Sequence, residues 1–233
     1  MERVAEAYAS VEDDHWWFAG RRAIVRAALG RFLPSGSSLL DVGCGTGGLT
    51  AALAQRYRVE GVDPSPAAAA EARARGLRVH LLELGEELPR GFDAVGAFDV
   101  LEHARDDLGL ARRLAAATRR GGLVVVTVPA FPMLWGPMDE TAGHVRRYRL
   151  APLVAVMEAA GLRRVHATYF NTLLFPAYAT ARLAGLPRRG RELAPPGPLM
   201  NRVLRRVLEL EAPLASRLRM PVGGSILYLG RKR

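Results

Sequence analysis

Short apolar runs alternate with helix-like segments through the first half of the chain. The intervening segments 46–57, 65–75 and 106–119 carry alanine or leucine at helical spacing, and a longer helix is expected over 14–32. The apolar runs themselves read SLLDV, RVEGVD, LRVHLLEL, FDAVGAF and GLVVVTVP. Regular alternation of strand and helix predicts a mostly parallel sheet that is covered by helices on both faces.

Two more strands are expected near the end of the chain, in LRRVHATYF and GGSILYLGRKR. About fifty residues rich in proline separate them, and a connection of that length is usually functional or forms its own substructure. The pattern therefore predicts a single α/β domain with a doubly wound, seven-stranded sheet. Its expected parts are an N-terminal helical segment, a core, a helical insertion and the last strand, at 1–34, 35–170, 171–220 and 221–233.

Length, cysteine content and charge narrow the class of protein. A chain of 233 residues can bury a proper core without disulfides, and the single cysteine, Cys44, cannot form an internal one. The chain shows no leader-like start and no apolar run of the roughly 20 residues that span a bilayer, so we expect a cytoplasmic protein. The net charge is +10, and residues 182–233 alone hold twelve basic residues against three glutamates.

The strongest local signal is LLDVGCGTGGLTAAL, residues 39–53, in which a glycine-rich turn joins an apolar strand to a helix. Glycines permit a tight turn, and they let a nucleotide-like ligand lie against backbone amides at the helix start. Gly43, Gly45 and Gly48 also satisfy G-x-G-x-x-G, and Asp63 follows at the distance that a dinucleotide-binding fold requires. Spacing alone therefore leaves a nicotinamide-dependent oxidoreductase open.

The residues around the loop distinguish these ligands. Asp41 stands two positions before the first glycine, where a carboxylate favours a cationic ligand and gives no advantage with a pyrophosphate. In D-x-G-x-G-x-G, written here as DVGCGTG over 41–47, the chain resembles the class I S-adenosylmethionine-dependent methyltransferases. The resemblance continues through VEGVDPSP, FDAVGAFDVLEH and GGLVVVTVP, and its D-x-L-E-H pattern is similar to the quinone-biosynthesis and related small-molecule branch.

The resemblance implies a Rossmann-like methyltransferase fold that uses S-adenosylmethionine and releases S-adenosylhomocysteine. It implies that Asp41 and Asp99 lie beside the methionine portion of the cofactor and that Asp63 binds the ribose hydroxyls. Leu84 stands where many relatives carry an adenine-binding acid, so backbone amides at Gly85 and Glu86 are expected to take that role. The remaining expected cofactor contacts are Gly43, Cys44, Gly45, Gly47 and Pro64.

Two histidines are the candidate catalytic residues. Methyl transfer from a sulfonium requires alignment of the acceptor, exclusion of water and, for an oxygen or nitrogen acceptor, removal of a proton. His103 follows the fourth strand in DVLEH, and His144 lies in DETAGHVRRY beyond the fifth. A packing role for His103, and a loop role for His144 beside Asp139 or Glu140, remain alternatives. No metal-ligand spacing is present, and we expect no metal.

The stretch HWWFAGRR, residues 15–22, suggests that the N-terminal helix covers the cofactor as a lid. In this hypothesis Trp16 or Trp17 packs over the ligand, and Arg21 or Arg22 binds its carboxylate. At helical spacing Trp17 and Arg21 share one face, so simple packing against the sheet is the competing interpretation.

The segment 198–220 forms a basic amphipathic helix whose apolar stripe consists of Leu199, Val203, Val207 and Leu210. Such a helix can pack on the domain, form a dimer interface or contact an anionic membrane peripherally. We expect a methyltransferase that acts on a small-molecule or lipid-like acceptor and does not bind nucleic acid. A nicotinamide-dependent oxidoreductase and a non-catalytic cofactor-binding or membrane-surface protein are the alternatives, and the oligomeric state is left open.

Overall fold

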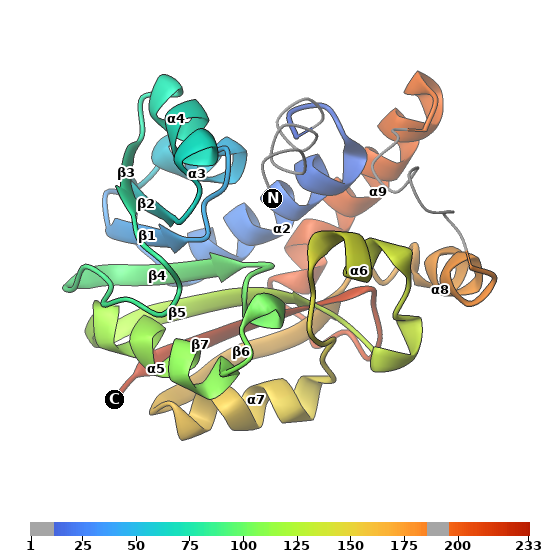
Figure 1. Ribbon diagram of the computed structural model, residues 1–233. Coiled ribbons are helices and arrows are strands. Elements are labelled where there is room, and N and C mark those ends of the chain that lie inside the picture. Colours follow the sequence, from blue (N-terminus) through green and yellow to red (C-terminus); the bar gives the residue numbers. More distant parts are fainter. Residues whose placement is uncertain (1–11, 186–195) are drawn as a thin grey trace.

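The computed structural model describes residues 12–185 and 196–233. Its seven strands form one sheet in the order β3-β2-β1-β4-β5-β7-β6 (Figure 1). Only β7 is antiparallel to its neighbours, and it lies between β5 and β6. The predicted doubly wound, mostly parallel sheet is confirmed. The strands are β1 (Ser38–Val42), β2 (Arg58–Asp63), β3 (Arg78–Leu81), β4 (Phe92–Phe98), β5 (Thr118–Pro129), β6 (Leu162–Phe170) and β7 (Ser225–Lys232).

Helices cover both faces of the sheet. In Figure 1, α2 and α9 lie above the sheet, α5 and α7 lie below it, and α3 and α4 stand at the end formed by β1, β2 and β3. The helices are α2 (Trp16–Phe32), α3 (Gly48–Ala54), α4 (Pro66–Ala74), α5 (Asp107–Ala117), α6 (Pro137–Ala142), α7 (Leu150–Ala159), α8 (Phe175–Leu183) and α9 (Pro198–Ala215). Short 3-10 turns occupy Leu101–His103 and Pro132–Leu134.

The core consists of two apolar layers, one on each face. Successive strand residues point to opposite faces of the sheet. Leu40 and Val42 therefore join the layer that packs against α5 and α7, whereas Leu39 joins the layer that packs against α2 and α9. Strands that are buried on both faces need continuous apolar sequence, which explains the unbroken run in β5.

Along the chain, α8 and α9 follow β6 and precede β7, where the insertion was expected. Helix α9 packs closely on α2, since a methyl group added at Gly20 would lie 2.3 Å from Leu208 Cδ1. The buried Glu211 accepts hydrogen bonds from the backbone amides of Thr172 and Leu173, which fixes α9 to the end of β6. Residues 1–11 of the expected N-terminal segment and 186–195 of the insertion lie outside the described residues.

The predicted apolar stripe of α9 is not the face that packs on the domain. Leu199, Val203 and Leu210 are 74%, 48% and 70% exposed. A neighbouring face that carries Leu208, Ala212 and Ala215 is buried instead. None of the helices within 12–185 and 196–233 combines the length and apolarity that crossing a bilayer requires.

Candidate functional site

The carboxyl ends of β2, β1 and β4, which are neighbours in the sheet, each carry an aspartate. Asp63 ends β2, Asp41 lies in β1 and Asp99 follows β4. Parallel pairing puts these strand ends at one edge, the position at which doubly wound sheets bind their ligands. The structure thus brings the three predicted acidic residues to one edge of the sheet.

The glycine loop lies at this edge between β1 and α3. Gly43 has φ 75°, and a Cβ atom there would lie 2.5 Å from Val100 Cγ2, so no larger residue fits. The Gly45 amide donates to Asp63 Oδ2 over 2.8 Å, and the Ser65 amide donates to Oδ1 over 2.9 Å. These bonds orient the Asp63 carboxylate, whose oxygens keep further lone pairs for a ligand. Pro64 follows Asp63 in the next turn, and Gly47 is the N-cap residue that precedes α3.

Asp41 is 2% exposed and accepts a hydrogen bond of 2.6 Å from the Thr50 hydroxyl. Burial raises the pKa of its carboxyl to about 7, although the Thr50 bond and the charge of Arg21 act in the opposite direction. A cationic group bound beside Asp41 would stabilise the ionised form. This carboxylate therefore suits a positively charged ligand.

Arg21 reaches from α2 to the carboxyl end of β4, where it forms an ion pair with Asp99. The other Asp99 oxygen accepts a hydrogen bond of 2.9 Å from the Thr127 hydroxyl. Arg22 turns elsewhere and donates to the carbonyl oxygens of Glu12 and Asp13. Of the two arginines proposed for the lid, the structure places Arg21 at the site.

Glu12 is a site residue that the sequence analysis missed. Its buried carboxylate accepts hydrogen bonds from the Thr46 hydroxyl and, over 3.3 Å, from the Gly48 amide at the start of α3. A carboxylate is favoured at a helix N-terminus, where free amides carry partial positive charge. Nothing in the local pattern around Glu12 indicates this distant contact, so sequence reasoning had no signal for it.

Two predicted cofactor residues pack against apolar parts of the domain: Trp17 is half-buried and Cys44 is buried. The ring of Trp17 stacks on Phe170 at 6.0 Å and 8°, which corresponds to the packing alternative. The Cys44 side chain lies against Gly61 and joins the small apolar cluster beneath α4, and burial raises the pKa of its thiol. The one polar contact of the Cys44 side chain is within the glycine loop, where its thiol donates to the Gly45 carbonyl oxygen over 3.7 Å.

The turn after β3, expected to meet adenine, closes on itself. The Glu86 amide donates to the Glu83 carbonyl over 3.0 Å, and the Glu83 amide donates to the Glu86 carboxylate over 2.7 Å. Space around Gly85 is open, since a Cβ there would meet no atom within 4 Å. Gly85 thus offers the more accessible backbone of the two.

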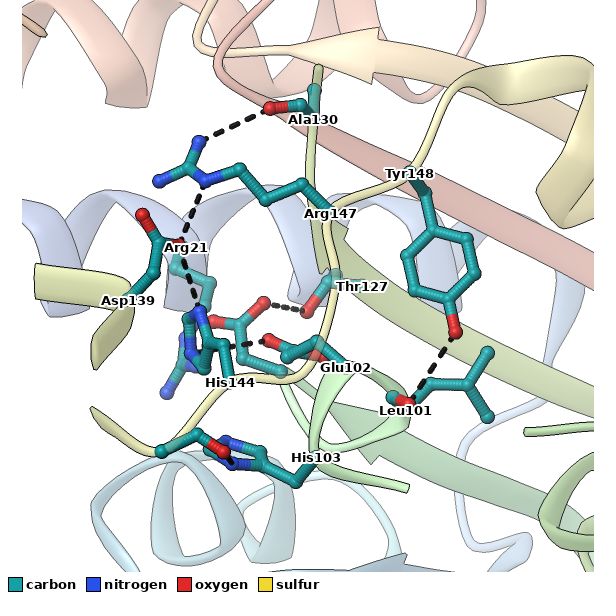
Figure 2. Close-up of polar contacts among 12 residues, drawn as sticks. Arg21, Leu101, Glu102, His103, Thr127, Ala130, Asp139, His144, Arg147 and Tyr148 are labelled. Carbon is teal, nitrogen blue, oxygen red and sulfur yellow. Dashed lines mark hydrogen bonds and ion pairs between the residues drawn. The ribbon is translucent and has the colours of Figure 1, made fainter. Parts of the chain in front are cut away.

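The second half of the site lies beyond Asp99 and consists of Glu102, His103 and His144. Glu102 and His103 belong to the 3-10 turn after β4, and His144 follows α6. The ring centroids of the two histidines lie 4.8 Å apart, and His144 Nε2 lies 3.9 Å from Glu102 Oε1 (Figure 2). The structure therefore brings the two predicted catalytic histidines together and adds a carboxylate.

Glu102 is completely buried, and neither carboxylate oxygen has a hydrogen-bond partner among the described residues. Burial raises the pKa of this carboxyl well above its usual value, and the negative charge of Asp99 acts in the same direction. A buried carboxylate without a partner is costly, so such groups commonly serve a ligand.

Asp139 positions His144. Its buried carboxylate lies 2.8 Å from His144 Nδ1, accepts a bond of 2.7 Å from Arg147 Nε, and pairs with Arg182 of α8. Burial would raise the pKa of Asp139, but the bonds from His144 and Arg147 and the arginine charges lower it to about 2. The ionised carboxylate holds the proton of His144 on Nδ1, so Nε2 faces Glu102. Sequence reasoning missed Arg147 and Arg182.

With this geometry established, comparison with known proteins identifies the family. Residues 17–167 match the sequence profile of a family described as "Methyltransferase domain". The chain belongs to this family. The matched region contains the glycine loop, the three aspartates and both histidines, so it spans both halves of the site.

Relatives of this methyltransferase domain agree with the assignment. The chain is 34% identical over 103 residues to a "Ubiquinone biosynthesis O-methyltransferase" of Pseudomonas paraeruginosa, a match that covers 40% of the chain and 44% of that relative. A putative methyltransferase in complex with the Trm112 activator of Haloferax volcanii superposes with a TM-score of 0.64 at 19% identity, covering 96% of this chain and 92% of that one.

A second solved structure, a Haemonchus contortus phosphoethanolamine N-methyltransferase in complex with S-adenosylhomocysteine, superposes with a TM-score of 0.56 at 20% identity. That likeness covers 88% of this chain and 51% of the other. At these identities the two structural neighbours establish a shared fold, which is the Rossmann-like fold expected from the sequence.

Proposed function

We propose that this domain transfers the methyl group of S-adenosylmethionine to a hydroxyl oxygen of a small-molecule or lipid-like acceptor and releases S-adenosylhomocysteine. The observation that carries the proposal is the adjacency of two groups of residues at one sheet edge. Asp41, Asp63 and the glycine loop suit a cationic nucleoside, and Glu102, His103 and His144 lie immediately beyond Asp99. Family membership and the methyltransferase activities for which the relatives are named support it.

In this reaction the acceptor oxygen attacks the methyl carbon, the bond from carbon to sulfur breaks, and the hydroxyl proton passes to a histidine of the site or to water. The sulfonium is already activated by its charge, so the protein has to align the acceptor, exclude water and assist proton loss. Asp41 and Asp99 would hold the methionine portion, and Asp63 the ribose. His103 and His144 would face the acceptor hydroxyl.

Titration calorimetry with S-adenosylhomocysteine, run beside NADH, tests the cofactor. We expect the first ligand to bind and NADH not to bind. Asp63→Ala should weaken binding by about 1–3 kcal/mol through loss of charge-assisted hydrogen bonds. Glu60→Ala is the matched control, since Glu60 lies in the same strand but pairs with His80.

Each result has a clear meaning. Binding of NADH alone would overturn the methyltransferase proposal in favour of the oxidoreductase alternative. Unchanged affinity in a folded Asp63→Ala variant would overturn the ribose assignment while leaving the cofactor in place. Acceptor screening with hydroxylated aromatic compounds follows a positive result, and failure to methylate any acceptor would favour the non-catalytic alternative.

We also propose that the exposed stripe of α9 rests on an anionic membrane surface. Leu199, Val203 and Leu210 are exposed on one side of the helix, and Arg202 and Arg206 are exposed beside them. Apolar side chains flanked by arginines fit the boundary between acyl chains and anionic headgroups.

Co-sedimentation with vesicles tests this surface. Binding should rise with the fraction of anionic lipid and fall with salt, because surface charges are screened. The double variant Val203→Ser, Leu210→Ser should lose most of the binding. Leu81→Ser, an exposed leucine at the opposite end of the sheet, should keep it. Binding that ignores both lipid charge and the α9 substitutions would overturn the proposal.

A further inference from the structure

The geometry points to a divalent-cation site formed by Glu102, His103 and His144. Each residue offers one ligand atom, and the three atoms lie within 4.8 Å of one another. A cation bound between them would need only small side-chain movements to reach ligand distances of about 2.0–2.2 Å. Glu102 and His103 come from the turn after β4 and His144 from the loop after α6, so the site closes between two segments (Figure 2).

The state of Glu102 is an independent sign of a ligand. The side chain is completely buried, and neither of its oxygens has a hydrogen-bond partner among the described residues. Glu102 Oε1 forms an ion pair with His144 Nε2 at 3.9 Å, a distance that exceeds hydrogen-bond length. A cation between these atoms would satisfy the carboxylate and remove the cost of burying it.

Both histidines are oriented as metal ligands usually are. His103 Nδ1 lies 3.3 Å from the Gly143 carbonyl oxygen, and His144 Nδ1 lies 2.8 Å from the Asp139 carboxylate. A ring nitrogen next to an acceptor of this kind carries the proton, which leaves the Nε2 lone pair available. Histidines that bind metals commonly donate their second nitrogen to a carbonyl or a carboxylate in this way. Asp139 is therefore a positioning residue for the site.

The set of ligands indicates the kind of cation. Two imidazoles and one carboxylate suit first-row transition ions such as Zn²⁺, Mn²⁺ or Co²⁺, whereas Mg²⁺ and Ca²⁺ prefer oxygen ligands. Three protein ligands leave coordination positions open for an oxygen of the acceptor. This inference departs from the expectation of no metal, because the ligands come from distant segments and follow no recognised spacing.

The role of the cation rests on the proposed function, whereas the binding site itself does not. A bound cation would hold the acceptor hydroxyl beside the cofactor and lower its pKa, so that the proton leaves to water before the oxygen attacks the methyl carbon. His103 and His144 would then act as ligands and would not take up the proton. An acceptor with two neighbouring oxygens, such as a catechol or a hydroxyquinol, could occupy two coordination positions.

Titration with Co²⁺ tests the site. The protein is the full chain without an affinity tag, and a chelator first removes any bound metal. Visible absorption of bound Co²⁺ and calorimetry should report one equivalent. Glu102→Gln, which keeps the shape of the side chain, and His103→Ala, which alters a partly exposed ring, should each weaken binding at least 10-fold. His80→Ala is the matched control, because His80 also pairs with a glutamate, Glu60, and lies on β3.

Failure of wild-type protein to bind Co²⁺, or equal binding in folded Glu102→Gln and His103→Ala, would overturn the site. Thermal unfolding of each variant establishes that it is folded. If only one of the two variants folds, its Co²⁺ affinity is compared with that of wild type. Because no cofactor is present in this titration, its outcome is separate from S-adenosylhomocysteine binding. Co²⁺ binding with no S-adenosylhomocysteine binding would support the cation site and contradict the proposed function.

Discussion

The two halves of the site lie at the same sheet edge, but they are held by different means. We call them, after the roles proposed above, the cofactor half (Asp41, Asp63, Asp99 and the glycine loop) and the acceptor half (Glu102, His103 and His144). In the cofactor half, Asp63 is oriented by the amides of Gly45 and Ser65, and Asp41 is bound by Thr50, all within one stretch of sequence. In the acceptor half, His144 depends on Asp139, which is paired with arginines from a loop and from α8. Contacts that are local in sequence hold Asp41 and Asp63, although Asp99 pairs with Arg21 of α2. His144 is held through a buried ion-pair network that reaches α8.

This difference has consequences for what each half can tolerate. Backbone amides cannot be removed by substitution, so the cofactor half retains part of its geometry when one side chain changes. A buried ion-pair network loses more, because removing one partner leaves the remaining charges buried without compensation. The acceptor half is thus the part whose chemistry can be reshaped by changes far away, including changes in α8.

The largest effect is expected from Asp139→Asn. The substitution leaves the buried guanidinium groups of Arg147 and Arg182 without their carboxylate, which should cost about 3–5 kcal/mol of unfolding free energy. Urea denaturation measures this loss. Glu87→Gln, which breaks the exposed pair with Arg90, is the control and should change stability by less than about 0.5 kcal/mol. Equal, small losses in both variants would show that the network does not hold the acceptor half together.

A smaller effect of opposite sign is expected from Asp41→Asn in the unliganded protein. The folded pKa of about 7 exceeds the ordinary 3.8, so ionisation of Asp41 opposes folding increasingly as the pH rises from 3.8 to 7. Arg21 lowers this pKa, while Glu12 and Asp63 raise it. The free energy of unfolding of Asp41→Asn, relative to wild type, should therefore rise by about 2–3 kcal/mol between about pH 5 and about pH 8, at about 1.4 kcal/mol per pKa unit.

Urea denaturation of wild type and Asp41→Asn at both pH values measures this change. The same variant should bind S-adenosylhomocysteine more weakly, because the ligand's amino group loses its carboxylate partner. An advantage that stays constant with pH would mean that Asp41 keeps an ordinary pKa when buried. Ionised Asp41 would then not destabilise the unliganded protein, and the two halves would differ less in how their charges affect stability.

That the proposed cofactor residues lie together could be predicted from the sequence, because local geometry places most of them. Asp41, the three glycines of the loop and Asp63 stand at strand ends that apolar runs already define, and parallel strands bring those ends to one edge. The alternation of strands and helices along the sequence likewise predicted the mostly parallel sheet. The positions of Glu12 and Trp17 could not be predicted, because their partners, Thr46 and Phe170, are remote in sequence and share no pattern with them.

The acceptor half shows a second limit. Residue type singled out His103 and His144, but no periodicity relates the turn after β4 to the loop after α6. Arg182 resembles any basic residue of a helix until the fold buries it against Asp139. The stripe on α9 was identified correctly as apolar, yet which side of the helix packs depends on the close contact between Gly20 and Leu208. Such contacts are properties of the assembled fold.

The smallest expected effects come from a matched pair of glycine substitutions. Gly45 has φ 55° and Gly143 has φ 74°, and a Cβ added at either would meet no atom within 4 Å. Gly45→Ala and Gly143→Ala should therefore each cost roughly 1–2 kcal/mol of stability through backbone conformation alone. Since their structural cost is alike, any difference in ligand binding reports on the half of the site that each glycine serves.

Gly45→Ala should weaken S-adenosylhomocysteine binding, because the Gly45 amide orients Asp63 and, in the proposed function, the loop backbone would lie against the cofactor. Gly143→Ala should leave that affinity unchanged and weaken Co²⁺ binding, because the Gly143 carbonyl orients His103. Calorimetry with each ligand on both variants provides the four measurements. If both variants lost affinity for the same ligand to the same extent, the two halves of the site would be coupled. The two halves would then not be held separately.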